Sequence, residues 1–317
     1  MTQTNGRFWG YAGRFVLVHV VVYTLIATIF TLLQDALPST TQTALETLGP
    51  YHTAGVISTP AQVVRALIVA LVLYPFYDTI VRGRRGLLIL FGALWGVALL
   101  GSVEPMPGSI EGFIYTETPL LAHFLALAVV AVEVFLFSWF FLRWERQSSA
   151  EMDCAQEEVV SQDKRVAGYV TRFTIVHVFT YAAAGILLFT LQDYADAFAI
   201  QERFELYRPL DDPIIAAAIP IQILRGALLA IFFLPFYDTF LSKSHGWLLL
   251  FGLTFGLIAL GGANFFTGVL TDIVNRTAFS EFLIGPIEIT IQMLLFSLLL
   301  FAWERRRARK LQAQPVN

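Results

Sequence analysis

The chain is poor in charge and in cysteine. Only 14% of its 317 residues are charged, against about 25% in a typical soluble domain, which excludes a soluble enzyme and a nucleic-acid-binding domain. Cys154 is the only cysteine, which excludes an intramolecular disulfide and a cysteine-based zinc or iron–sulfur site. Phosphate-loop, His-Glu-x-x-His, nucleophile-elbow and dinucleotide-binding motifs are also missing. The sequence therefore offers neither ATP hydrolysis nor a nucleophile–base set for an enzyme.

Long apolar runs dominate the chain instead. The residues are 56% hydrophobic and the mean hydropathy is +0.66. Runs of about 20 apolar residues are long enough to cross a bilayer as helices. We expect an all-α integral membrane protein with eight transmembrane helices, at 15–33, 55–77, 86–103, 118–142, 173–191, 213–237, 246–270 and 282–302.

The basic residues indicate an orientation. Sixteen of the 21 Lys and Arg residues fall in the N-terminus, in the loops after the second, fourth and sixth runs, and in the C-terminus. The positive-inside rule therefore predicts a multi-pass protein of the plasma (inner) membrane with both termini in the cytoplasm. The opposite loops carry 13 of the 24 acidic residues. That charge either attracts cations to the outer face or simply keeps those loops in water.

The sequence also repeats itself. Residues 10–35 align with 168–193 without gaps and share 11 of 26 residues. Residues 60–101 align with 220–261 and share 17 of 42. We infer a duplicated four-helix unit, because chance does not place so many polar residues in register in apolar helices. Four is an even number, so both repeats have the same orientation, which predicts a pseudo-twofold axis along the membrane normal.

The repeat divides the chain into segments. We expect a first four-helix repeat at 1–146, a polar cytoplasmic linker at 147–167, a second repeat at 168–310 and a disordered tail at 311–317. The linker is rich in Ser, Gln, Glu and Asp, which is typical of a plain tether, with partner binding as the alternative.

Small residues in the third and seventh runs predict close helix packing. Gly92 and Gly96 are four residues apart, and so are Gly252 and Gly256. Glycines at this spacing let neighbouring helices approach closely.

An outer layer of polar residues lies within the runs of both repeats. A charged side chain in mid-membrane costs roughly 2.5–3.5 kcal/mol on insertion scales, so each one needs a partner or a use. Gln62 and Arg65 share a helix face, and Asp35 ends the neighbouring run on the same side. We expect an Arg65–Asp35 pair, either as a structural clamp or as an ion-coordinating station. The second repeat carries the same set as Gln222, Arg225 and Asp193.

An inner layer combines Arg14 with His19 and Tyr23, which are four residues apart on one stripe. The second repeat carries these residues as Arg172, His177 and Tyr181. The aspartates of the repeated Pro-Phe-Tyr-Asp-Thr run, Asp78 and Asp238, lie at the same depth, so we expect a His–Asp or Arg–Asp bond that fixes the first two helices. Alternatively, His19 and His177 face each other across the axis, where two neutral imidazoles can ligate a haem iron (haem b) or relay protons.

Two carboxyls break the repeat. Glu133 aligns with Gln292, whereas Glu288 lies four residues before Gln292 on the same helical face. The fourth and eighth helices thus each carry one mid-membrane carboxyl. These are packing features if they are protonated and hydrogen-bonded, and they are the best candidates for coupling proton or cation movement if they titrate.

Three functional hypotheses follow. The first is passage of a small solute or ion without ATP, through a path between the repeats, with Glu133 and Glu288 at mid-depth. The second is a haem-binding or redox membrane subunit that uses His19 and His177. The third is a non-catalytic scaffold in a homo-oligomer or a larger membrane complex. The lipid bilayer is the one partner that the composition itself implies, and no cofactor other than the alternative haem is expected.

Overall fold

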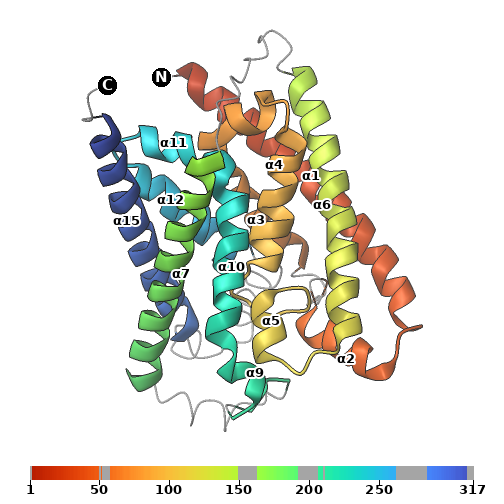
Figure 1. The fold of residues 1–317 in the computed structure, drawn as a ribbon. Helices are drawn as coiled ribbons and strands as arrows, with labels where there is room; N and C mark the ends of the chain where they lie inside the picture. The colour runs from red at the N-terminus through yellow and green to blue at the C-terminus, as the bar shows by residue number, and fades with distance from the viewer. Residues whose placement is uncertain are drawn as a thin grey trace.

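The computed structural model describes residues 2–49, 51, 58–148, 163–191, 206–209, 211–261 and 284–312. These residues are almost entirely helical. An isolated antiparallel β-bridge joins Thr116 and Tyr207. Both ends of the chain lie at the same end of the helix bundle (Figure 1). We call this end the terminus side and the opposite end the far side.

Six of the helices are long and apolar enough to cross a membrane. They are Arg7–Gln34, Thr59–Phe76, Leu120–Ser148, Val166–Leu187, Ala218–Ser242 and Ile287–Lys310. The predicted all-α fold is thereby confirmed, and these helices are compatible with the predicted multi-pass membrane protein. The third and seventh predicted spans appear as two shorter apolar helices, Gly86–Leu100 and Gly246–Ala259, which fall below the length of a full crossing within the described residues.

The first half of the molecule is built on a long helix, α1 (Thr2–Gln34). It packs along α3 (Ser58–Leu73) and α6 (Leu120–Ser148). The other elements of this half are α2 (Ser39–Leu48), the 3₁₀-helix η2 (Tyr74–Phe76), the π-helix η3 (Asp78–Arg82), α4 (Gly86–Phe91), the π-helix η4 (Gly92–Leu100) and α5 (Ile110–Tyr115).

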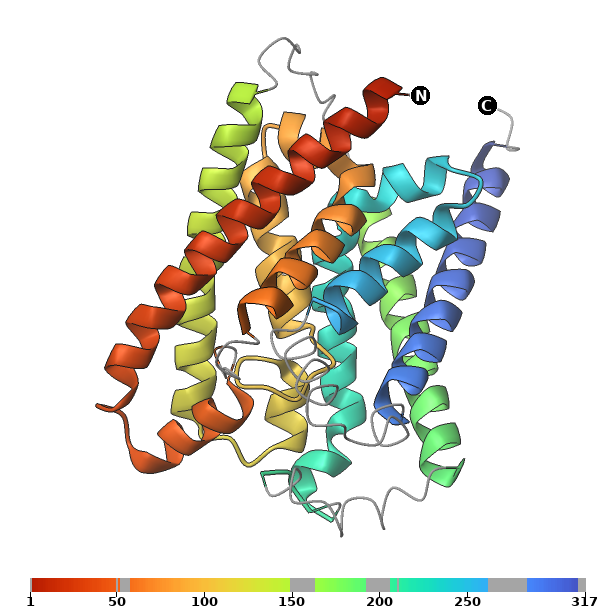
Figure 2. The ribbon, with the colours of Figure 1, turned by 180° about the vertical axis from the view of Figure 1, so that it is seen from behind.

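The main helices of the second half make corresponding contacts. Here α7 (Asp163–Leu191) packs against α10 (Ala218–Phe233) and α15 (Ile284–Gln312). Figure 2 shows α1 crossing the bundle diagonally toward one edge, with α15 at the opposite edge. The other described elements of this half are α9 (Pro213–Ala216), the 3₁₀-helix η6 (Leu234–Phe236), α11 (Tyr237–Ser242), α12 (Gly246–Thr254) and the π-helix η7 (Phe255–Ala259).

Proline interrupts the second long helix of each half at the same place. Pro75 lies in η2 and Pro235 lies in η6. Proline has no N–H to donate to the preceding turn, so the α-helix gives way to a tight 3₁₀ turn. In both halves the chain then runs on to a short helix and a loop on the terminus side.

The two halves meet in a packed apolar seam. A Cβ on Gly96 would lie 2.4 Å from the ring of Phe232, and one on Gly256 would lie 2.4 Å from Val72. The close packing that the glycine spacing predicts is therefore confirmed at Gly96 and Gly256. A Cβ on Gly252, in contrast, would have no neighbour within 4 Å. Side chains of the opposite half therefore fill the seam at Gly96 and Gly256.

Candidate functional site

A polar cluster closes the terminus side of the first half. The Arg14 guanidinium donates to the Glu145 carboxylate at 2.6 Å, and the Tyr77 hydroxyl donates to the other oxygen at 2.8 Å. Glu145 is 1% exposed. The cluster ties α1 and α6 to the chain segment that follows η2, so three elements of this half are held together at one carboxylate.

The second half carries the same cluster. Arg172 donates to Glu304 at 2.5 and 3.0 Å, and the Tyr237 hydroxyl donates to Glu304 at 2.7 Å. Both glutamates come from the repeated Trp-Glu-Arg motif, and the sequence interpretation missed their role. Their repetition in register with the arginines was the signal that could have found them.

The aspartates predicted to take this place do not. Asp78 is exposed and pairs with Arg82 at 3.0 Å, and Asp238 is exposed as well. Successive residues on a helix point about 100° apart, so an aspartate directly after an inward-facing tyrosine points out of the bundle. The predicted bonds from the first helices to Asp78 and Asp238 are therefore wrong.

The two mid-helix histidines contact glutamines of their own halves. Nε2 of His19 lies 3.2 Å from Oε1 of Gln62, and Nε2 of His177 lies 3.1 Å from Oε1 of Gln222. The two imidazoles line different cavities. They do not face each other, and the nitrogen that an iron would need is engaged in each, so this geometry does not fit the haem alternative.

Arg65 reaches across the seam to the other half. Its Nε donates to the Gly261 carbonyl at 2.9 Å, and Nη1 donates to Gln62 at 3.1 Å. Asp35 is exposed at the end of α1, so the predicted Arg65–Asp35 pair is wrong. The physical reason is that carbonyls at the end of a helix lack an internal donor, and a guanidinium from the other half supplies one. Asp193 lies outside the described residues.

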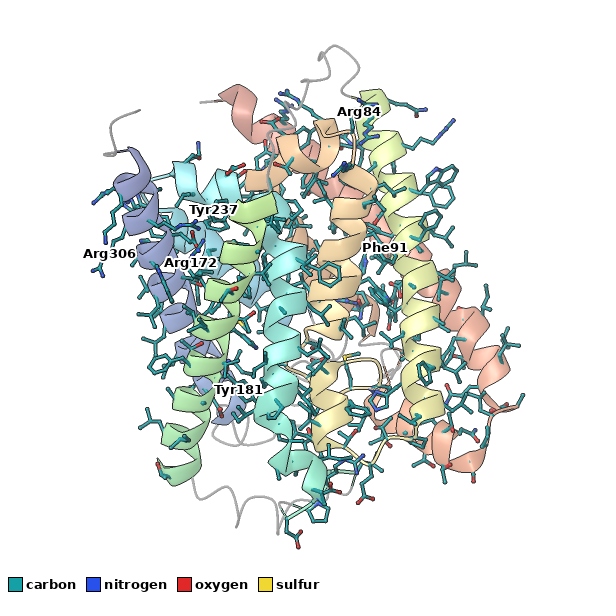
Figure 3. All side chains as sticks on the ribbon, viewed as in Figure 1. Arg84, Phe91, Arg172, Tyr181, Tyr237 and Arg306 are labelled. Carbon is teal, nitrogen blue, oxygen red and sulfur yellow. The ribbon has the colours of Figure 1, made fainter. Side chains whose placement is uncertain are left out.

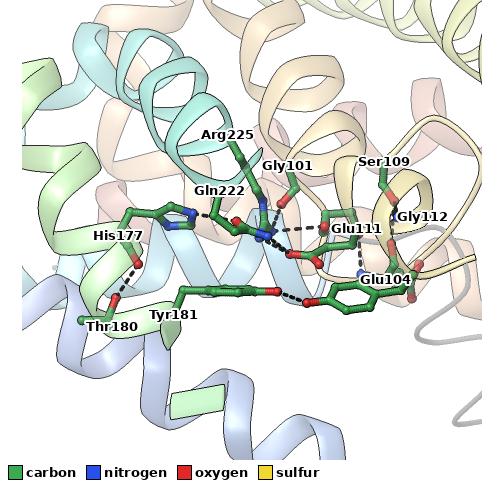
Figure 4. A network of polar contacts seen from close by, with 12 residues as sticks. Gly101, Glu104, Ser109, Glu111, Gly112, His177, Thr180, Tyr181, Gln222 and Arg225 are labelled. Atoms are coloured by element: carbon green, nitrogen blue, oxygen red, sulfur yellow. Dashed lines mark hydrogen bonds and ion pairs between the residues drawn. The ribbon is translucent and has the colours of Figure 1, made fainter. Parts of the chain in front are cut away.

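Arg225 makes the reciprocal contact. It donates to the Gly101 carbonyl at 2.7 Å, and Gly101 and Gly261 are aligned positions of the repeat. Arg225 also forms an ion pair with Glu111, and Gln222 donates to the same carboxylate at 3.0 Å (Figure 4). Arg225 is 1% exposed and Glu111 is 5% exposed. A carboxylate of the first half thus neutralises the buried arginine of the second.

The far-side loop that carries Glu111 is built locally. Ser109 caps α5 by accepting from the Gly112 N–H at 2.8 Å. Gly108 adopts a positive φ of 92°, which favours glycine, and its N–H donates to Nδ1 of His123 at 3.1 Å. These contacts aim the first turn of α5 at the second half.

The last residue of α5 also contacts the second half. The hydroxyls of Tyr115 and Tyr181 lie 2.5 Å apart (Figure 4). Burial raises the pKa of Tyr115 to about 12, so its phenol stays protonated at ordinary pH and remains able to donate.

Glu133 occupies a different setting, beside a cavity in the first half. The Tyr51 hydroxyl donates to Glu133 at 2.6 Å. Burial and the neighbouring Glu133 carboxyl raise the pKa of Tyr51 well above its usual value, so the phenol is a permanent donor. The cavity has a volume of about 40 Å³, and its polar lining consists of His19, Tyr23, Arg65, Glu133 and the Gly261 backbone.

The counterpart cavity in the second half is smaller. Its volume is about 20 Å³, and its lining includes His177, Arg225 and Gln292. Gln292 stands where the first half has Glu133. Glu288 is half-buried on α15 and lines neither cavity. Of the two mid-membrane carboxyls singled out from the sequence, the structure therefore places Glu133 at the first of these cavities and Glu288 outside both.

Aromatic side chains close the first-half cavity toward the terminus side. The rings of Phe15 and Phe137 lie 4.7 Å apart, and those of Phe15 and Phe141 lie 5.0 Å apart. Tyr11 packs edge-on against Phe141 at 5.4 Å. This aromatic plug, made of Tyr11, Phe15, Phe137 and Phe141, separates the cavity from the Arg14–Glu145 cluster.

Comparisons with protein families, with curated proteins and with solved structures found no match to this chain. Within the described ranges, no group of three His, Cys, Asp or Glu residues is placed to hold a metal ion.

Proposed function

We propose that the chain forms an eight-span membrane protein made of two parallel four-helix repeats, with the terminus side in the cytoplasm. The recurring order of helices and the reciprocal Arg65 and Arg225 contacts support the repeat. The six long helices and the two shorter apolar ones, at 86–100 and 246–259, account for the eight spans. The basic residues of the terminus side support the orientation.

The function that this arrangement supports best is passage of protons across the membrane without ATP, with Glu133 as the group that carries the proton. One observation carries the proposal: a mid-helix carboxyl borders a polar cavity and, among the described residues, forms no ion pair. An intramembrane ionisable residue of this kind marks a proton or ion pathway by default.

The size of the cavity narrows the class of solute. A buried water needs about 10–15 Å³ of cavity volume, so about 40 Å³ holds about three or four waters. That volume suits a short water chain and leaves no room for an organic solute.

The lining favours a proton over a metal cation. Hard cations such as Mg²⁺ and Ca²⁺ take six or more oxygen ligands. The side chains of the cavity supply the Glu133 carboxyl and the Tyr23 hydroxyl, and Arg65 adds a positive charge. A proton needs one carboxylate oxygen, with the other free to accept from Tyr51.

The packing of the seam also leads us to propose a different path from the one expected between the repeats. The seam between the repeats is filled by Phe232 against Gly96 and by Val72 against Gly256, so we place the path inside the first half. Protons enter the cavity from the far side, whose loops are acidic. Release on the terminus side requires the aromatic plug to move aside.

A flux measurement tests this proposal. The full chain is reconstituted in liposomes that hold a pH dye, and a potassium gradient with valinomycin drives proton entry. Glu133→Gln keeps an acceptor for Tyr51 but removes the titrating group, so we expect proton flux to fall to the level of empty liposomes.

Glu288→Gln is the matched control, because it makes the same change in the eighth span away from either cavity. It is expected to keep the wild-type flux. Wild-type flux in Glu133→Gln contradicts the proposal, and so does a flux of Na⁺ or K⁺ that is independent of pH.

A further inference from the structure

A groove runs between α7 and α15 on the terminus side. Its volume is about 860 Å³, and one face of each helix lines it, because side chains three and four residues apart share a face. Its rim is basic and its floor is apolar. The rim carries Arg306, Arg307 and Lys310, and the deeper part carries Ile175, Phe179 and Leu299.

The acids that the structure describes do not neutralise the basic residues of the rim. Arg172 also borders the groove, but Glu304 takes its guanidinium. Among the described residues, Arg306, Arg307 and Lys310 form no ion pair. Figure 3 shows Arg306 and Arg172 at the same level of the two helices.

Two of the groove's arginines lie against the same glycine of α7. A Cβ at Gly168 would lie 2.9 Å from Nη1 of Arg172 and 3.4 Å from Nη1 of Arg307. Both guanidinium groups therefore lie close to the backbone of α7.

The first half lacks this feature, although it shares the cluster beneath it. The positions aligned with Arg306 and Arg307 are Gln147 and Ser148, both exposed at the end of α6. The positive rim is therefore an addition to the second half and no part of what the duplicated framework needs.

We propose that this groove binds the headgroup of an anionic phospholipid, with an acyl chain along its apolar floor. The polarity of the groove matches that of a lipid, because the cations lie at the ends of the helices and the apolar residues lie deeper. Basic pockets between transmembrane helices bind such headgroups, and each cation near an anionic surface adds a factor of about five in affinity.

Native mass spectrometry of the full chain in detergent tests the site. The protein is offered equal amounts of phosphatidylglycerol and phosphatidylcholine, and the retained lipids are counted. Wild type is expected to retain phosphatidylglycerol preferentially. Arg306→Gln with Arg307→Ser, which installs the residues of the first half, is expected to lower that preference by about tenfold or more.

Arg305→Gln with Arg309→Gln is the matched control. It removes the same charge from the same helix outside the groove, where Arg305 donates to the Ser244 carbonyl. This variant is expected to keep the preference within about twofold. An unchanged unfolding midpoint of the first variant without lipid shows that its fold is intact.

Three results overturn the proposal: no headgroup preference in wild type, equal losses in the two variants, or complete displacement of the lipid by an excess of inorganic phosphate. The last result identifies a free-anion site instead. None of these results bears on proton flux, so the two proposals fail independently.

Discussion

The two halves hold a His, a Gln and an Arg in the same relation but surround them differently. In the first half His19, Gln62 and Arg65 lie at a cavity that also contains Glu133. In the second half Arg225 is neutralised by Glu111 of the first half, and the cavity has about half the volume. A buried carboxyl that pairs with an arginine has a structural role, whereas one that borders a polar cavity without an ion pair is the candidate for chemistry.

Arg65 and Arg225 make corresponding contacts between the two halves. Arg65 binds the Gly261 carbonyl and Arg225 binds the Gly101 carbonyl, so each half completes a helix end of the other. The halves therefore differ in their buried carboxyls, whereas both use an arginine contact that joins them.

The largest expected effect on stability is at the Arg225–Glu111 pair. Glu111→Ala leaves a buried arginine without its counter-charge, which costs about 3–5 kcal/mol. Asp35→Ala, in the first half, removes an exposed carboxylate that the sequence pairs with Arg65, and we expect a change within about 0.5 kcal/mol. Unfolding in mixed detergent micelles measures both. A loss below about 1 kcal/mol in Glu111→Ala would contradict the expected difference in stability between the Arg225 site and the Arg65 site.

The terminus-side clusters should respond alike. Glu145→Gln and Glu304→Gln each remove the charge that holds an arginine and a tyrosine. Because Arg14 and Arg172 are partly exposed, we expect a loss of about 2–3 kcal/mol in each variant, below the full cost of a buried pair. The same unfolding assay compares them. A difference above about 1.5 kcal/mol means that the clusters are not equivalent.

The smallest stability effect is expected for two far-side tyrosines, Tyr51 and Tyr115, which should differ in their effect on proton flux. Tyr51→Phe and Tyr115→Phe each remove one buried hydrogen bond, so each costs about 1 kcal/mol. Only Tyr51 donates to Glu133, so proton flux should fall several-fold in Tyr51→Phe and stay at the wild-type rate in Tyr115→Phe. Equal flux in the two variants would show that the Tyr51 contact is merely structural.

Much of the helical framework was predictable from the sequence. Apolar runs predicted the helices, because a backbone in lipid must satisfy its own hydrogen bonds. The glycine spacing predicted the close approach at Gly96 and Gly256. The repeat also drew attention to His19, Gln62 and Arg65, which the structure brings together.

The partners of the charged residues were not predictable in the same way. Aligning the repeats suggests pairs within one repeat, such as Arg65 with Asp35. The actual partners of Arg65 and Arg225 come partly from the other half, and that depends on how the halves dock. Glu111 was missed for a further reason: it lies in a far-side loop, where a carboxylate is expected to face water.

Moving the carboxyl from one half to the other tests the central claim most directly. In the double variant Glu133→Gln with Gln292→Glu, the same side chains are present in exchanged positions. Proton flux into liposomes should be absent, because the second cavity has room for about one water and its arginine is already held by Glu111. Flux restored to the wild-type rate would show that the halves are interchangeable and would contradict the assignment of the path to the first half.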